Sequence, residues 1–125
     1  MVDRKIKGQE IIKAMFGEMK DDSRPAFKDM GNLTSDYLFG EIWSRPGLAL
    51  RDRSLVTVSI LVATGKEKQL RTHLIGALAN GLTPAELKES IMHAAHYSGW
   101  PCGVNGLRVL QELAEEQNLD FSNDN

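Results

Sequence analysis

One glutamate and two histidines are spaced so that a helix would gather them on one side. Offsets of four and seven residues separate Glu89 from His93 and His96, and at 3.6 residues per turn the three side chains share a face. A histidine transfers protons near neutral pH, and a neighbouring carboxylate can orient and charge it. An ordinary solvated face gives the same pattern, and such residues can also ligate zinc. We predict a proton-transfer face here and no metal site.

Two arginines flank an aspartate where a long apolar segment begins. Arg51, Asp52 and Arg53 precede Ser54 and the run that starts at Leu55. An aspartate suits the positive end of a helix dipole, but two arginines do not. A planar guanidinium is the natural clamp for a carboxylate. The arginines are therefore candidate ligands of an anionic substrate, and a solvated helix start is the alternative.

A third histidine, His73, lies on an apolar stripe. Leu70, Leu74 and Ala77 share this stripe at helical spacing. A histidine on such a face is more often a hydrogen-bonded core residue than a catalyst. Its apolar neighbours also fit the wall of a pocket, and they favour His73 over His93 as a proton donor. Both histidines stay candidates.

The elements that would carry these residues are predicted to be helices. Apolar residues from Ile11 to Met19 recur at three- and four-residue spacing, and a second helical stretch covers about 26–43, interrupted near Gly31 and Asn32. The β-branched run over 55–63 favours a strand by propensity. Because no second segment is available to pair with it, we predict a helix that is buried on all faces.

Boundary signals are clearest in the second half of the chain. A helix over 68–80 ends at Gly81, and the segment 83–86 superposes a Thr and Glu capping box on a proline at the first helical position. That helix runs to about Tyr97, and Pro101 opens the last one. The predicted fold class is all-α, with one domain over 1–125. It is a bundle of about six helices, with its core mainly from the apolar helix and the pair flanking Gly81, and a frayed tail over 118–125.

Composition excludes several classes of function. The chain has 125 residues, of which 42% are hydrophobic and 26% charged, with a formal net charge of -2. It lacks the basic excess of nucleic-acid binders. Cys102 is the only cysteine, so no intramolecular disulfide can form. No apolar stretch of about 18 residues suggests a membrane span or a signal segment, and we expect a cytoplasmic protein.

Five segments together resemble the carboxymuconolactone decarboxylase family. They are IWSRPGL at 42–48, RDRSLVT at 51–57, LRTH at 70–73, NGLTPAE at 80–86, and Glu89 with YSGWP at 97–101. Their co-occurrence in register is far more specific than any single motif. The resemblance implies an all-helical fold and a ring-shaped homo-oligomer, commonly a hexamer. The namesake enzyme decarboxylates 4-carboxymuconolactone in the protocatechuate branch of the β-ketoadipate pathway.

The resemblance implies decarboxylation of 4-carboxymuconolactone, or a related carboxylated lactone, to the β-ketoadipate enol-lactone. Loss of carbon dioxide leaves a carbanion conjugated to the lactone carbonyl, so the substrate is its own electron sink and no cofactor is expected. The expected catalytic residues are His73, His93, Glu89 and Arg53, and the expected substrate-binding residues are Arg51, Arg53, His96 and Trp100. The alternative is a protein of the same fold that acts on another small molecule or only binds one.

The wider superfamily includes alkylhydroperoxidases, whose relay is a glutamate, a Cys-x-x-Cys pair and a following histidine. The spacing of that motif places the glutamate at Ser54, the cysteines at Lys66 and Gln69, and the histidine at His73. Only the histidine is present here. Without the two thiols, disulfide exchange cannot run, and peroxidase activity is not expected.

Overall fold

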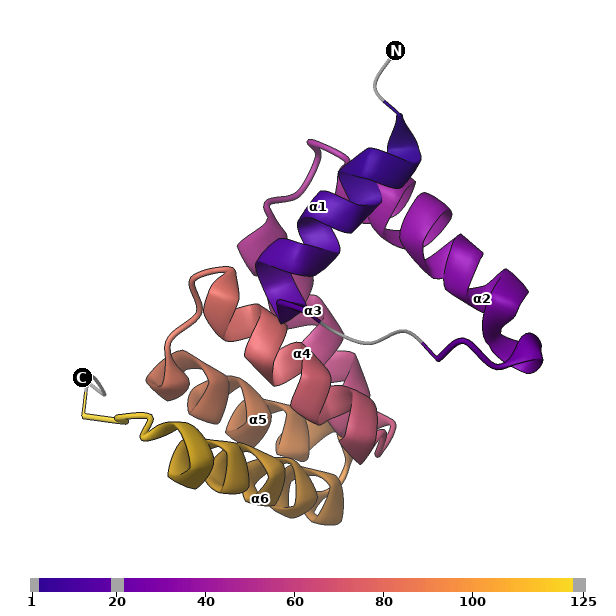
Figure 1. Ribbon diagram of the computed structural model, residues 1–125. Coiled ribbons are helices and arrows are strands. Elements are labelled where there is room, and N and C mark those ends of the chain that lie inside the picture. Colours follow the sequence, from indigo (N-terminus) through magenta and orange to yellow (C-terminus); the bar gives the residue numbers. More distant parts are fainter. Residues whose placement is uncertain (1–2, 19–21, 123–125) are drawn as a thin grey trace. The chain divides into compact units, whose positions relative to one another are not determined.

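The computed structural model describes residues 3–18 and 22–122, and these residues form helices joined by turns (Figure 1). No strand occurs within these two ranges, which confirms the predicted all-α class. The chain divides after Leu50 into two compact units, which we describe separately. The assignment of residues 1–125 to one domain stays a prediction. In the described part of the chain, no helix is both long enough and apolar enough to cross a bilayer.

The first unit contains two longer helical segments joined by short ones. In chain order they are α1 (Arg4–Phe16), the 3₁₀ turn η1 (Pro25–Phe27), α2 (Lys28–Leu33) and the π-helix η2 (Thr34–Trp43). Helix α1 begins earlier than its apolar pattern predicted, because the Asp3 side chain caps it by accepting a hydrogen bond from the Lys5 N–H. Met19 lies outside the described residues. The predicted interruption near Gly31 and Asn32 is wrong, since α2 runs through both residues and the hydrogen-bond pattern changes only at Thr34.

Two glycines allow α1 and η2 to pack backbone against backbone. A Cβ on Gly8 would lie 1.9 Å from the Ser35 carbonyl oxygen, and one on Gly40 would lie 2.2 Å from that of Arg4. Both contacts are far inside van der Waals distance, so any side chain would force the helices apart. Beside this crossing the unit buries a small hydrophobic core of Met15, Phe39 and Trp43.

Four longer helices form the second unit. They are α3 (Leu50–Ala63), α4 (Glu67–Ala79), α5 (Pro84–Ser98) and α6 (Trp100–Gln117). The boundary signals are confirmed: Gly81 has φ +102°, and Thr83 and Glu86 exchange the two capping-box hydrogen bonds, at 3.0 and 3.1 Å. These local signals fix where α5 begins and therefore which of its residues share a face.

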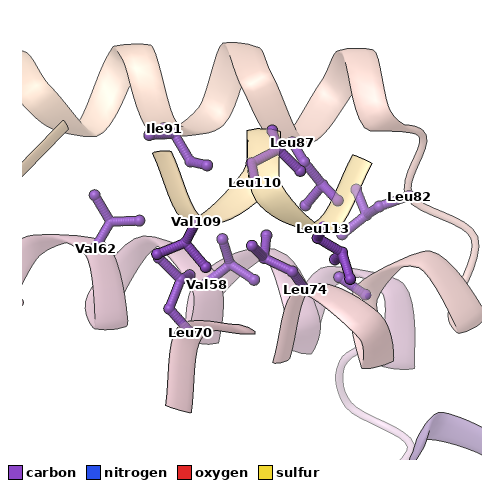
Figure 2. Close-up of a cluster of buried hydrophobic side chains, with 11 residues drawn as sticks. Val58, Val62, Leu70, Leu74, Leu82, Leu87, Ile91, Val109, Leu110 and Leu113 are labelled. Atoms are coloured by element: carbon purple, nitrogen blue, oxygen red, sulfur yellow. The ribbon is translucent and has the colours of Figure 1, made fainter. Parts of the chain in front are cut away.

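The core of the second unit is built by all four helices (Figure 2). Its buried side chains are Val58, Val62, Leu70, Leu74, Ala77, Leu82, Leu87, Ile91, Val109, Leu110 and Leu113. The last three come from α6. Gly103 allows α6 to pack close to α5, because it has no side chain. A Cβ at this position would lie only 2.3 Å from the Ala95 Cβ.

Helix α3 confirms one prediction and corrects another. The β-branched segment is helical, as the missing partner strand required. It is not buried on all faces: Val58 and Val62 are buried, while Val56 and Ile60 are 51% and 55% exposed. Within the second unit, the side of α3 that carries Val58 and Val62 packs on the core.

The C-terminal tail is ordered further than predicted. Asn118 adopts a left-handed conformation with φ 53° and ends α6. Beyond it, Leu119 and Phe121 are partly buried against the core of the second unit. The predicted fraying of 118–125 therefore does not apply to these two residues, and 123–125 lie outside the described residues.

Candidate functional site

A groove between α3 and α5 contains the predicted proton-transfer face. Glu89, His93 and His96 line one end of it, which has a volume of about 550 Å³. Leu55 and Ser59 of α3 form the opposite wall there. The groove continues along α5, where further lining residues are Ile60, Ala63, Ala94, Tyr97 and Ser98. The prediction that the glutamate and both histidines share a face is confirmed, and this face adjoins apolar walls.

Neighbouring groups orient both groove histidines. The Nδ1 of His96 lies 2.9 Å from the Met92 carbonyl oxygen. A carbonyl can only accept, so Nδ1 carries the proton and, in the neutral ring, Nε2 keeps its lone pair. The ring of His96 meets Trp100 edge-on at 5.5 Å, and the ring of His93 lies 5.3 Å from that of Tyr97. The two imidazoles are thus held by aromatic contacts at the groove.

Arg51, a predicted substrate ligand, is engaged by carboxylates of its own chain. Its guanidinium forms an ion pair with Glu86, and it lies 3.7 Å from the carboxylate of Asp52. The pKa of Glu86 is lowered, first by the hydrogen bond from the Thr83 backbone and then by the one from Arg51. This arrangement links the start of α3 to the capping box of α5.

Arg53 and Ser54 occupy the first turn of α3. Arg53 is half-buried, and its carbonyl oxygen accepts a 2.8 Å hydrogen bond from the Thr57 hydroxyl. Ser54 is fully buried, and its Oγ accepts a 3.0 Å hydrogen bond from the Asn80 side chain. The sequence interpretation missed this pair. A serine at the edge of an apolar run and an asparagine before the Gly81 turn were its only signals.

His73 lies in the middle of α4, half-buried among core residues. Leu74 beside it and Leu70 one turn earlier are buried. Burial lowers the pKa of His73 from its ordinary value of 6.5, because desolvation disfavours the imidazolium. His73 is not among the residues that line the α3–α5 groove. The predicted site residues therefore form two sets. Glu89, His93 and His96 line the groove, and the residues outside it are His73, Arg51, Arg53 and Trp100.

Two further kinds of group could carry chemistry here, a metal-binding cluster and the Cys102 thiol. Across residues 3–18 and 22–122, no three His, Cys, Asp or Glu side chains are grouped closely enough to hold a metal ion. Cys102 is half-buried at the start of α6, where its Sγ lies 3.7 Å from the Ala63 carbonyl oxygen. The acid and base groups of the site are thus a glutamate and imidazoles.

Comparison with known proteins shows which family the chain belongs to. A model of the carboxymuconolactone decarboxylase family matches residues 28–112. The chain belongs to the carboxymuconolactone decarboxylase family. This confirms the resemblance seen in the motifs, and the matched range includes every predicted site residue from Arg51 to Trp100.

Two relatives of this family member carry the names of enzymes. The chain is 42% identical to 4-carboxymuconolactone decarboxylase of Acinetobacter baylyi, over 92% of this chain and 83% of that protein. It is 30% identical to nitrosuccinic acid decarboxylase of Metarhizium robertsii, over 92% and 78% of the two chains. It is also 30% identical to an uncharacterized 15.0 kDa protein of Paracoccus denitrificans, over 88% and 87%. This family member is a carboxy-lyase.

Proposed function

We propose that this carboxy-lyase converts 4-carboxymuconolactone, or a closely related carboxylated lactone, to the β-ketoadipate enol-lactone in protocatechuate catabolism. The observation that carries the proposal is the 42% identity, over 92% of the chain, to a relative named for that reaction. A second relative is named for nitrosuccinic acid. The alternative is therefore another small carboxylic acid, or binding without turnover.

The chemistry asks three things of the protein. The bond between the ring carbon and the carboxylate breaks, its electron pair moves through the conjugated ring to the carbonyl oxygen of the lactone, and a proton must then reach a ring carbon. The substrate itself is the electron sink, and the protein supplies a grip on the second carboxylate, stabilisation of the oxyanion and the proton. Arginine and histidine side chains suit these tasks.

We assign the proton to His73, with His93 as the second candidate. Burial lowers the pKa of His73, so the free protein holds it mainly neutral at pH 7. An anionic substrate beside it would stabilise the imidazolium and raise that pKa, so that binding and protonation are coupled. His93 is supported by its place in the groove, where Glu89 can orient and charge it.

We assign the carboxylate clamp to Arg53. Its backbone is fixed by its neighbour Ser54, which is buried and bonded to Asn80. A fixed attachment point reduces the entropy lost when the guanidinium grips a substrate. Arg51 is already engaged with Glu86, which favours a role in holding α5. His96 is assigned to a substrate contact in the groove, and Trp100, whose ring meets that of His96 edge-on, to a contact just outside it.

The proposed assembly is a ring-shaped homo-oligomer, commonly a hexamer in this family. Support comes from apolar side chains that one chain leaves in water, among them Val56, Ile60 and Tyr97. Exposed apolar patches of this kind mark contacts between proteins. A location in the cytoplasm stays a prediction.

The test of function is a decarboxylation assay on the purified full chain. Carbon dioxide release and the ultraviolet change of the lactone are followed with 4-carboxymuconolactone and, in parallel, with nitrosuccinate. Turnover of the lactone alone supports the proposal. Turnover of nitrosuccinate alone overturns it in favour of the alternative acid, and saturable binding of the lactone without release of carbon dioxide overturns it in favour of a binding protein.

A further inference from the structure

A second hollow, between α5 and α6, has a different chemistry from the histidine groove. Its volume is about 590 Å³. Most of its wall is apolar, with Met92 on α5, Val104 and Leu107 on α6, and Phe121 from the tail. Met92 is the one residue that this hollow shares with the groove.

The charged side chains that line this hollow are both cations. They are Lys88 on α5 and Arg108 on α6, and no described acidic residue lines the hollow. In the groove, by contrast, the charged lining residue is Glu89. The hollow therefore offers two cations and no described carboxylate to a bound molecule.

Arg108 differs from several other arginines of the chain. Arg4, Arg24, Arg51 and Arg71 each form an ion pair with an acidic side chain. Arg108 makes no ion pair with any described residue, and its Nη1 donates a 2.9 Å hydrogen bond to the Asn105 side-chain oxygen. That neutral amide orients the guanidinium without supplying an opposite charge.

The apolar wall is partly open to solvent. Met92 and Val104 are each 43% exposed, while Leu110 beneath them is buried. Phe121 is held here because the tail packs on the core. An apolar floor with two cations on two helices matches a molecule that has a small apolar body and one carboxylate.

We propose that this hollow is a binding site for a small apolar carboxylate, such as an aromatic acid. The ring would cover Val104, Leu107 and Phe121, and Arg108 and Lys88 would bind the carboxylate. The site uses none of the residues assigned to decarboxylation, so it can be tested independently of the proposed reaction.

The experiment is a titration of the full chain with benzoate. Binding is measured by calorimetry and by the methyl NMR signals of Val104 and Leu107. Benzamide, with the same ring and no charge, is the matched ligand control. We expect saturable binding of benzoate, affinity for benzamide lower by roughly tenfold or more, and benzoate affinity that falls as salt is raised. Absence of saturable binding, equal binding of both ligands or no salt dependence would each overturn the proposal.

Charge-removing variants locate the site. Arg108→Gln and Lys88→Gln should each weaken benzoate binding by roughly tenfold and leave decarboxylation unchanged. Arg71→Gln, which removes an arginine of α4 that pairs with Glu116, should leave benzoate binding unchanged. Unaltered affinity in Arg108→Gln overturns the proposal. Dissociation of the assembly by Arg108→Gln, seen by light scattering without any benzoate effect, does so too and assigns the hollow to a contact with a second copy.

Discussion

The Asn80 side-chain nitrogen donates a 3.0 Å hydrogen bond to the hydroxyl oxygen of Ser54. The two residues are 26 positions apart, so the bond joins the end of α4 to the first turn of α3. Ser54 has no solvent exposure, and a buried polar group is stabilising only when it has a partner. The bond therefore ties the turn that carries Arg53 to the end of α4.

Ser54→Ala should lower the free energy of unfolding by about 1–3 kcal/mol, because the Asn80 amide then loses a buried acceptor. Urea denaturation measures this change. The matched control is Ser59→Ala in the same helix, where the hydroxyl donates to the Leu55 carbonyl of its own turn. The control should cost clearly less, and equal losses in the two variants would show that the Ser54–Asn80 bond has no special weight.

His73→Ala should lower kcat by roughly 10²-fold, the scale expected for removal of a general acid. Far-ultraviolet dichroism and the melting temperature are measured on the same sample. If His73 is only a core residue, the melting temperature falls and turnover per folded molecule stays nearly unchanged. His93→Ala is the matched variant in the groove, and a normal rate for His73→Ala with a collapsed rate for His93→Ala moves the proton to His93.

Stability should depend on pH through His73. Its pKa is lowered in the folded chain, so between the ordinary value of 6.5 and the lowered value the unfolded chain binds more protons. The contribution of neutral His73 to the free energy of unfolding is therefore complete above pH 6.5, and it is lost as the pH falls through that window. The free energy of unfolding should fall less from pH 7.5 to 5.5 in His73→Gln than in the wild type. Parallel slopes in the two proteins would contradict the assignment.

Arg53→Lys should raise KM more than it lowers kcat. Lysine keeps the charge but lacks the two-pronged geometry with which a guanidinium binds a carboxylate. The comparison is Arg51→Lys, which alters the arginine paired with Glu86 and should act mainly on stability. A larger KM effect in Arg51→Lys would reassign the clamp to that residue.

Gly103→Ala should destabilise the second unit by about 1–3 kcal/mol, the range for overpacking a tight contact. The new methyl group would lie 2.3 Å from the Ala95 Cβ. Adding Ala95→Gly should restore most of the loss, since it removes the atom that clashes. Gly31→Ala, where a Cβ meets nothing within 4 Å, should not destabilise. A stable Gly103→Ala would mean that α5 and α6 separate easily.

Local signals predicted much of the fold. The Gly81 turn and the capping box of Thr83 and Glu86 involve residues close in sequence, so they can be predicted without the tertiary structure. The exposure of Val56 and Ile60 is different, because it depends on which side of α3 has neighbours. The π-helix from Thr34 and the packing of Phe121 likewise depend on contacts between segments.

In the candidate site, too, the features that arise within one helix were predictable from the sequence, and those that join two helices were not. Helical periodicity sufficed to place Glu89, His93 and His96 on one face. The pairing of Arg51 with Glu86 joins two helices, and no spacing within one segment predicts it. The lowered pKa of His73 depends on how deeply its side chain is buried. A stripe of apolar residues predicts which side of α4 faces the core, but not how deep that side lies.

Ser54 also constrains how this sequence could change over evolutionary time. The resemblance to alkylhydroperoxidases places their relay glutamate at this position and their cysteines at Lys66 and Gln69. Both of the latter residues are exposed, so thiols could return there at little structural cost. A carboxylate at position 54 would replace a fully buried hydroxyl and carry its charge into the core, where desolvation is expensive. A lineage that passed from decarboxylation to peroxide chemistry would have to rebuild the first turn of α3 before the two cysteines were of any use.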